Sequence, residues 1–267
     1  MRDGASREII TGAQYVQQMT ALESDRRARM AFLDLALKVA SPGAALLDFG
    51  AGTGIDARFY AAHGRRVTAY DVDTKMCEFF AEHCRDLIDA GSVTLETGTY
   101  PDFLARHRAS ATHAIDLVTA NFAPLSLIGD LNELFAAFHT VTRPGGKVLA
   151  SVLNPYFIGD LRYGWWWRNV PRLWLSGHYS VPGAQAPIVR RRLAQCAAEC
   201  APYFTLEHVF RGLPSNEEHR ANGIAVAEGH WSKWTQMATC RFLFLLFEKK
   251  CSRSPLLPID REPSAAA

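Results

Sequence analysis

The 267-residue chain has no long hydrophobic run. Its longest wholly apolar stretch is Phe242 to Phe247, far shorter than the roughly 20 residues with which a helix crosses a bilayer. The opening residues, Met1 to Gly4, lead into polar sequence without the apolar core of a secretory signal. We therefore expect no integral membrane association, and a soluble, cytoplasmic protein.

The chain also has little net charge. Its 29 lysines and arginines face 27 aspartates and glutamates, and the formal net charge is +2. Nucleic-acid-binding proteins ordinarily carry a marked basic excess, so we expect no nucleic-acid partner. With 48% hydrophobic and 21% charged residues the composition is that of an ordinary globular protein, long enough for one large domain.

Metal and disulfide signatures are absent as well. None of the six cysteines forms a C-x-x-C motif, and no H-E-x-x-H cluster occurs. Cys196 and Cys200 lie one helical turn apart, which would permit a shared metal face, but two small residues packed on a helix explain the spacing more simply. A cytosolic setting argues against disulfides. We predict no metal site.

What the chain does have is a glycine-rich turn directly after an apolar strand. Leu46 to Phe49 is followed by glycines at three alternate positions, and a second strand, Val67 to Tyr70, ends in Asp71. Glycines let a backbone approach a ligand closely, and the free N–H groups of the following helix face that ligand. An acidic residue after the next strand can accept both hydroxyls of a ribose. The pattern predicts an adenosine-type cofactor at one edge of a parallel sheet.

The spacing of the glycines bears on which cofactor binds. Dinucleotide sites use G-x-G-x-x-G, whereas here the third glycine comes one place early, at Gly54, and Ile55 occupies the dinucleotide position. A nicotinamide-dependent oxidoreductase on a similar sheet is therefore the alternative and not the preferred interpretation. A non-catalytic protein that binds the cofactor on the same fold is a further alternative.

The motif D-F-G-A-G-T-G at residues 48–54 resembles motif I of the class I S-adenosylmethionine-dependent methyltransferases. Residues 67–73 resemble the second motif of that family, and residues 115–122 resemble its fourth strand and the exit from it. Arg143-Pro144-Gly145-Gly146-Lys147-Val148-Leu149 resembles the beginning of its fifth strand. The resemblance covers residues 40–155 well. It implies S-adenosyl-L-methionine as cofactor and methyl transfer as reaction.

Strands and helices alternate between residues 46 and 153, which indicates an α/β fold with right-handed β-α-β units. Predicted strands cover 46–49, 67–70, 93–96, 115–120, 147–153, 204–210 and 240–248, and predicted helices cover 54–63, 74–90, 129–141 and 188–202. We expect a Rossmann-like, mostly parallel sheet of about seven strands with a terminal antiparallel pair. The resemblance implies the strand order 3-2-1-4-5-7-6. Residues 1–40 are assigned to N-terminal helices, 41–267 to the methyltransferase domain, and 252–267 to a disordered tail.

Residues 154–187 interrupt this pattern. They hold four of the six tryptophans, together with Arg162, Arg168 and Arg172. The insertion follows strand five, at the sheet edge where ligands bind. We interpret it as a lid over the substrate. Packing against the core, a dimer contact, and contact with a membrane interface through the mixed tryptophan and arginine side chains are alternatives.

The resemblance assigns roles to individual residues. Asp48 would help to hold the methionine end, Asp71 the ribose, and Val72 and Met76 the adenine; Asp71 could instead cap the next helix, and Asp48 could be structural. Thr99 stands where the family often has an acid beside the adenine, so its backbone and that of Tyr100 are the expected contacts. The predicted cofactor-binding residues are Asp48, Gly50, Ala51, Gly52, Thr53, Gly54, Asp71, Val72, Met76, Thr99, Tyr100, Asn121 and Phe122.

The acceptor is predicted less sharply. The sequence N-F-A-P-L at residues 121–125 resembles bacterial small-molecule methyltransferases and lacks the N-P-P-Y signature of enzymes that methylate DNA bases or protein glutamine. We expect a small metabolite with an oxygen or nitrogen acceptor. No general base is identifiable; His178 in the insertion and Tyr15 in the N-terminal helix are the candidates. The chain is compatible with a homodimer.

Overall fold

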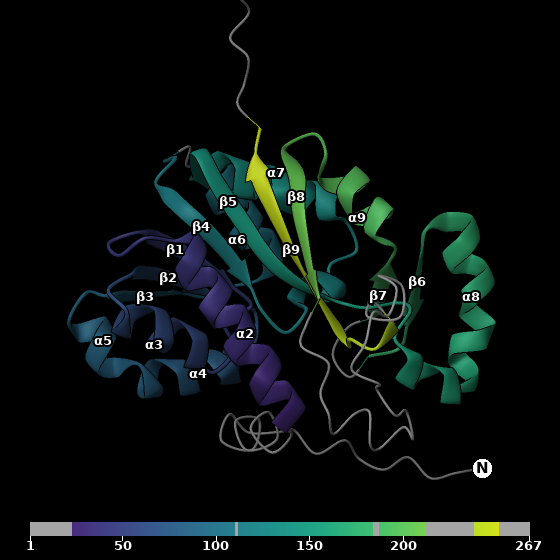
Figure 1. Ribbon diagram of the computed structural model, residues 1–267. Helices are drawn as coiled ribbons and strands as arrows, with labels where there is room; N and C mark the ends of the chain where they lie inside the picture. The colour runs from purple at the N-terminus through teal and green to yellow at the C-terminus, as the bar shows by residue number, and fades with distance from the viewer. Residues whose placement is uncertain (1–22, 110–111, 184–186, 212–237, 251–267) are drawn as a thin grey trace, which may run out of the picture.

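The computed structural model of the protein describes residues 23–109, 112–183, 187–211 and 238–250. A seven-stranded sheet with the order β3-β2-β1-β4-β5-β9-β8 forms its centre (Figure 1). The strands are β1 (Ala45–Phe49), β2 (Arg66–Tyr70), β3 (Val93–Glu96), β4 (Ile115–Ala120), β5 (Thr142–Leu153), β8 (Phe204–Arg211) and β9 (Phe242–Lys249). Strands β1 to β5 pair in parallel, and β9 runs antiparallel to both β5 and β8. The predicted fold class and strand order are confirmed.

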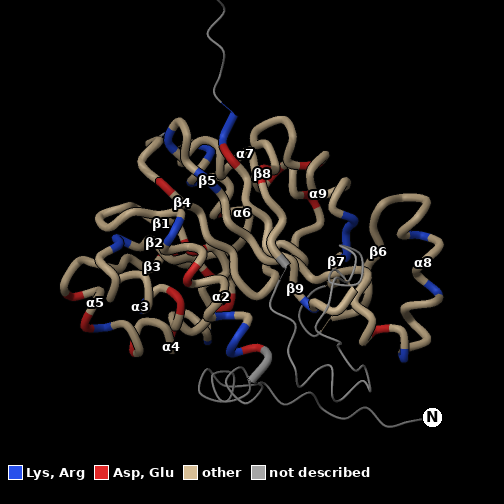
Figure 2. Tube along the Cα trace, in the orientation of Figure 1, with Lys and Arg blue, Asp and Glu red and all other residues tan. Residues whose placement is uncertain are grey.

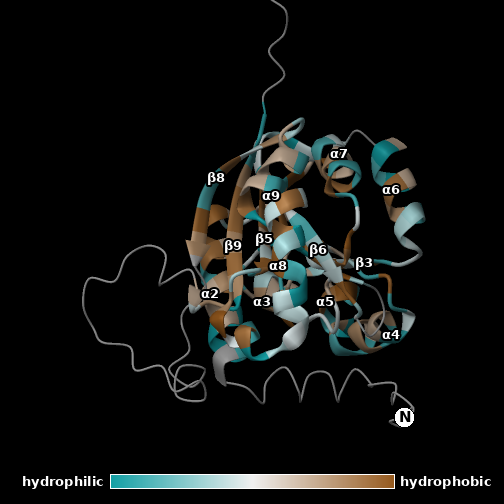
Figure 3. Cartoon of the chain, turned by 90° about the vertical axis from the view of Figure 1, so that its right-hand side faces the viewer, coloured by the Kyte–Doolittle hydropathy of each residue, from teal (hydrophilic) through white to brown (hydrophobic). Residues whose placement is uncertain are grey.

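Helices cover both faces of the sheet (Figures 1 and 3). One face carries α2 (Glu23–Val39), α3 (Ile55–Ala62), α4 (Thr74–His83) and α5 (Arg85–Asp89). The other carries α6 (Tyr100–Ala109), α7 (Leu131–Val141) and α9 (Leu193–Cys200). The parallel strands are buried between these layers, which is why β1 and β4 read as nearly continuous apolar runs and not as alternating ones. Cys196 and Cys200 both belong to α9 and are buried in the core on its inner side.

Three predicted elements need correction. The helix expected over 74–90 breaks at the buried Cys84 into α4 and α5. The helix expected over 188–202 is wrong in its first part, because Ile188–Arg191 forms strand β7 and pairs with β6 (His178–Val181). Helix α6 was not predicted. Strand β5 begins at Thr142, earlier than expected, with an irregular register to β4 before Lys147.

The segment after β5 forms a separate small unit. It consists of the 3-10 turn η2 (Ile158–Arg162), helix α8 (Gly164–Ser176) and the antiparallel hairpin of β6 and β7. Gly177, with φ 80°, ends α8 and donates its N–H to the Leu173 carbonyl at 3.1 Å. The unit lies beyond α9, at the margin of the molecule far from β3 (Figure 1).

Among the described residues, no helix combines the length and the apolar character that a bilayer-spanning segment requires. Tyr15 and residues 252–267, both subjects of predictions above, lie outside the described residues.

Candidate functional site

The glycine-rich turn joins β1 to α3 and is tied to the end of β2. The N–H groups of Gly50 and Ala51 both donate to the Tyr70 carbonyl, at 2.8 and 3.0 Å. A side chain at Gly50 would place its Cβ 2.7 Å from Cβ of Pro124, in the segment that follows β4. Because Gly50 has φ 75° as well, only glycine suits this position. The turn thus brings the ends of β1, β2 and β4 together at one edge of the sheet.

Asp71 links the turn to the end of β2. Its Oδ2 accepts the N–H of Gly52 at 2.7 Å, and its Oδ1 accepts the N–H of Asp73 at 2.9 Å. The helix cap considered for Asp71 is made by Asp73 instead, which accepts the N–H groups of Lys75 and Met76 at 2.9 and 3.3 Å. Each carboxylate oxygen has two lone pairs, so Asp71 keeps acceptor capacity for a ribose.

Asp71 is half-buried, and this burial raises the pKa of its carboxyl, although the two amide donors favour the charged form. The neighbouring Val72 is 60% exposed, and Met76 is partly buried. An exposed valine beside a paired carboxylate offers an apolar surface next to hydrogen-bond acceptors. This combination fits a nucleoside with a flat base and two hydroxyls.

Thr99 is occupied as a helix cap. Its N–H and its hydroxyl both donate to Oδ2 of Asp102, at 3.0 and 2.6 Å, and its hydroxyl accepts the N–H of Asp102 at 3.4 Å. This reciprocal capping box starts α6, the helix that was not predicted. Tyr100 packs edge-on against Phe49, and its buried hydroxyl has no hydrogen-bond partner among the described residues. The side chain of Thr99 is therefore directed to α6.

The exit from β4 has a strained backbone. Phe122 and Ala123 have φ values of 59° and 63°, in the left-handed region that non-glycine residues rarely occupy. Three contacts hold this turn: Ala123 donates its N–H to Oγ of Ser151 at 2.8 Å, Phe122 donates its N–H to Oδ1 of Asn121 at 2.9 Å, and Asn121 donates from Nδ2 to Asp56 at 2.7 Å. Strain of this kind is typical of ligand sites, where the surrounding structure imposes it.

Helix α2 is connected to the same turn through Arg29. The guanidinium pairs with Oδ1 of Asp56 and lies 4.4 Å from the centre of the Phe122 ring. Both charged side chains are largely buried. Sequence reasoning missed Arg29 and Asp56, because charged residues on two predicted helices read as surface positions. The Asp56 carboxylate therefore connects α2, α3 and the exit from β4.

Asp48 is buried at the end of β1. Its Oδ1 accepts the hydroxyl of Thr119 at 2.8 Å, and its Oδ2 has no hydrogen-bond partner within the described part of the chain. Burial, reinforced by the neighbouring Asp56 carboxylate, raises the pKa of Asp48 to about 8. A free carboxyl oxygen below the glycine turn, together with a backbone cradle in which Gly50 cannot carry a Cβ, fits the amino-acid end of an adenosyl cofactor.

The raised pKa of Asp48 predicts a pH dependence of stability. The folded state binds a proton on Asp48 more tightly than the unfolded state, whose value is near 3.8. The free energy of unfolding should therefore fall as pH rises from about 4 towards 8, by at most about 1.4 kcal/mol per pH unit from this group. Urea unfolding at pH 5 and pH 8 should show a smaller decrease for Asp48→Asn than for the wild type. Equal decreases would show that Asp48 does not titrate in this range.

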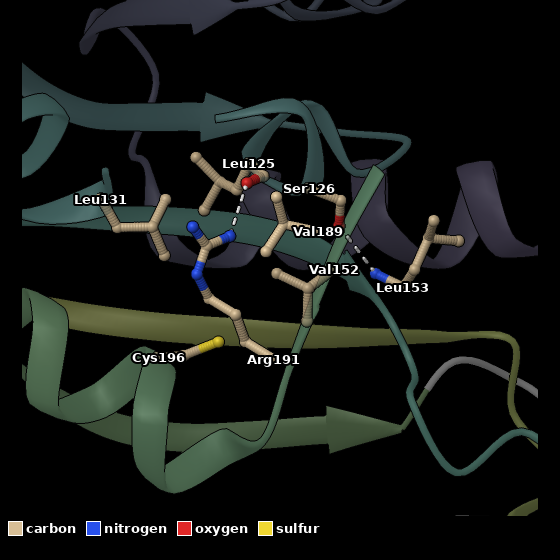
Figure 4. Close-up of a pocket in the computed structure, with 8 residues that line it drawn as sticks. All are labelled: Leu125, Ser126, Leu131, Val152, Leu153, Val189, Arg191 and Cys196. Atoms are coloured by element: carbon tan, nitrogen blue, oxygen red, sulfur yellow. Dashed lines mark hydrogen bonds between the residues drawn. The ribbon is translucent and has the colours of Figure 1, made fainter. Parts of the chain in front are cut away.

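The hairpin β6–β7 is joined to the exit from β4. Arg191 of β7 reaches the 3-10 turn η1 (Pro124–Leu127), and its Nη2 donates to the carbonyls of Ile128 and Gly129 at 2.7 Å each. Figure 4 shows the small cavity around this side chain, lined by Leu125, Ser126, Leu131, Val152, Leu153, Val189, Arg191 and Cys196. None of the predicted cofactor-binding residues lines it. The cavity marks the junction between the hairpin and the sheet edge, away from the glycine turn.

Of the two candidate general bases only His178 lies within the described residues, and none of its hydrogen bonds there leads to the glycine turn. His178 is exposed at the start of β6, where Nδ1 lies 3.2 Å from the Ser176 carbonyl oxygen. Of the predicted cofactor-binding residues, Thr53 is buried behind the turn, and Gly54, with φ 82°, precedes α3. The structure therefore gathers Asp48, the glycine turn, Asp71, Asn121 and Phe122 at one sheet edge and leaves the base unassigned.

Comparison with known sequences points to one family. Residues 19–188 match the family model described as a methyltransferase domain. The chain is 27% identical over 132 residues to a malonyl-[acyl-carrier protein] O-methyltransferase of Pectobacterium atrosepticum, a match covering 49% of this chain and 47% of the relative. It is 33% identical over 115 residues to phosphoethanolamine N-methyltransferase 1 of Zea mays, covering 41% and 21%. The chain thus spans about half, or less, of the length of the curated relatives it matches.

Comparison with solved structures gives the same fold. An S-adenosylmethionine-dependent methyltransferase from Mesorhizobium loti has a TM-score of 0.58 at 18% identity, covering 84% of this chain and 99% of the other. The 1,6-didemethyltoxoflavin-N1-methyltransferase of Burkholderia thailandensis, with bound 1,6-didemethyltoxoflavin and S-adenosylhomocysteine, has a TM-score of 0.56 at 18% identity, covering 90% and 84%. The family match decides against the nicotinamide-dependent alternative.

Proposed function

Since the chain belongs to the class I S-adenosylmethionine-dependent methyltransferases, we propose that it methylates an oxygen or nitrogen atom of a small molecule. The cofactor supplies a methyl group on a sulfonium, an already activated leaving group. The task of the protein is therefore alignment, and a well-oriented bound geometry can contribute about 7–11 kcal/mol to such a reaction.

Each part of the sheet edge has a separate task in this proposal. Asp71 accepts the ribose hydroxyls, and Val72 lies against the adenine. The turn of Gly50 and Gly52 gives close backbone access, and Asp48 offers its free Oδ2 to the methionine end. The left-handed turn at Phe122 fixes the wall on the acceptor side. Contacts from Ser151 and Asp56 hold that wall rigid, which favours one approach direction for the nucleophile.

The position of the hairpin β6–β7 is the observation that carries the small-molecule assignment. Arg191 binds this hairpin to the carbonyl groups that follow the exit from β4, which supports entry of the acceptor beside α8 and the hairpin. On the inner side of α8, Trp165 contacts Tyr179 and lies under the Arg190 guanidinium. We propose that this inner side is a lid that encloses the acceptor, as aromatic rings supply large contact areas with few torsions. The proteins named above as O- and N-methyltransferases support the two acceptor atoms.

The test is transfer of a labelled methyl group from S-adenosylmethionine to a panel of soluble phenols, carboxylic acids and amines. We expect at least one acceptor to be labelled. With that acceptor, Trp166→Ala should raise KM or lower kcat about tenfold, with cofactor affinity changed by no more than a few fold. The control is Tyr203→Ala, an aromatic truncation just before β8, at the end of the sheet opposite the glycine turn. This variant should leave KM and kcat near the wild-type values. No labelling across the panel, or equal effects of the two variants, would contradict the proposal.

A further inference from the structure

Helix α8 has two apolar sides, and the described residues pack against only one of them. Leu173 is buried on the inner side, and Trp165 and Trp166 are partly buried there. Trp166 donates its indole N–H to the Pro155 carbonyl at 3.1 Å. The inner side of α8 therefore faces the hairpin and the segment after β5.

The other side of α8 is apolar and exposed. Trp167 is 60% exposed, Trp174 68% and Leu175 88%, and Pro171 between them is exposed too. The positions 167, 171, 174 and 175 follow the spacing i, i+4, i+7, i+8, which places them on one side of the helix. We call these four residues the outer stripe. Figure 3 shows α8 in front of the other described elements.

The outer stripe has an electropositive border. Arg162, Arg168 and Arg172 are exposed, and α8 contains no acidic residue. The neighbouring Asp160 is buried and pairs with Arg190 at 2.8 Å. In Figure 2 the charged residues along α8 are all basic. Trp167 also has its indole N–H satisfied, by the Leu161 carbonyl at 2.8 Å, so its ring can enter an apolar phase without an unpaired donor.

We propose that the outer stripe docks on the surface of an anionic lipid bilayer. An amphipathic helix with tryptophan and leucine on one side and arginine beside them lies in the plane of such an interface, its apolar side among the acyl chains and its cations at the headgroups. A second copy of the chain fits less well, since two outer stripes facing each other would bring their arginines together without a carboxylate on α8 to neutralise them. Docking would leave the inner side of α8 on the protein and place the edge that carries the hairpin next to the membrane.

The experiment is sedimentation of the full-length protein with vesicles, one set of phosphatidylglycerol and phosphatidylcholine in equal parts and one of phosphatidylcholine alone. We expect the protein to sediment with the anionic vesicles and to be released at about 1 M salt, where the Debye length is about 3 Å. Trp174→Ser with Leu175→Ser should weaken partitioning about tenfold or more through lost apolar burial. Arg168→Gln with Arg172→Gln should weaken it about 25-fold, the product of about fivefold for each charge.

Matched controls lie elsewhere on the surface. Val209→Thr changes an exposed apolar residue of β8, and Arg85→Gln with Lys38→Gln removes two exposed cations from other helices; both variants should partition as the wild type does. Equal sedimentation with both vesicle sets, or unchanged partitioning of the outer-stripe variants, would overturn the proposal. A wild-type dimer by light scattering that the outer-stripe variant dissociates, without binding of either vesicle set, would overturn it in favour of a second copy.

Discussion

Gly52→Val is expected to lose S-adenosylmethionine affinity by more than about 100-fold, about 2.7 kcal/mol, while the protein stays folded. Gly52 has φ 55°, and its N–H donates to Oδ2 of Asp71 at 2.7 Å. A β-branched residue is strained by about 1–3 kcal/mol in this conformation. Relief of that strain would turn the amide away from Asp71, so one substitution would disturb both the close backbone approach and the ribose acceptor. Calorimetric titration of the cofactor measures the loss.

A glycine at the amino ends of the parallel strands, opposite the end that carries the glycine turn, provides the control. Gly91, just before β3, has φ 71°, and a Cβ there would meet no atom within 4 Å. Gly91→Val should therefore have a similar cost in stability and leave cofactor affinity within a few fold of the wild type. Near-normal affinity of Gly52→Val would mean that the turn does not cradle the cofactor.

Asp56→Ala should lower the free energy of unfolding by about 3–5 kcal/mol, the usual cost of leaving a buried ionic partner unpaired. The substitution leaves the guanidinium of Arg29 without its carboxylate, and the amide of Asn121 loses its acceptor. Because Arg29 lies on α2 and Asn121 follows β4, the variant should also loosen the strained turn at Phe122. Urea unfolding followed by circular dichroism measures the change.

The comparison is Asp86→Ala, which removes the partner of Arg58. That pair is bidentate, with distances of 2.7 and 3.0 Å, but both side chains are exposed. An exposed pair contributes only about 0–1 kcal/mol. If both variants lost the same small amount, the Asp56 carboxylate would not be the buried connection between α2 and the turn that the structure indicates.

The strand order could be predicted because its signals are local. The apolar runs of β1 and β4 and the glycine turn are each readable within a few residues, and the beginning of β5 carries its own motif. The prediction of a helix over 188–202 was wrong because the deciding contact is not local. Ile188 and Val189 continue an apolar pattern that is compatible with a helix, and only pairing with β6 makes them part of a strand. The partner strand β6 lies in a separate stretch of the chain, so the residues of β7 alone carry no signal of this pairing.

The cofactor-side residues of the site were predictable in type and position, whereas the contacts that hold them were not. Asp71 follows a strand and is visible from sequence, but its bond to Gly52 spans the β1–β2 unit. The pairing of Arg29 with Asp56 joins two helices, and its link to Asn121 adds a strand exit 65 residues away from Asp56. Such connections depend on the angle at which α2 packs on the sheet, which residue patterns do not encode.

The most direct test of the account is calorimetric titration of S-adenosylmethionine into folded Asp71→Ala, with Asp73→Ala as the control. Hydrogen bonds to a charged group are typically worth about 1–3 kcal/mol, so Asp71→Ala should bind roughly 5- to 150-fold more weakly than the wild type. Asp73→Ala, which removes the α4 cap two residues further on, should lose about 1 kcal/mol of stability and keep its affinity within a few fold. Wild-type affinity in folded Asp71→Ala would contradict the assignment of this sheet edge as the cofactor site.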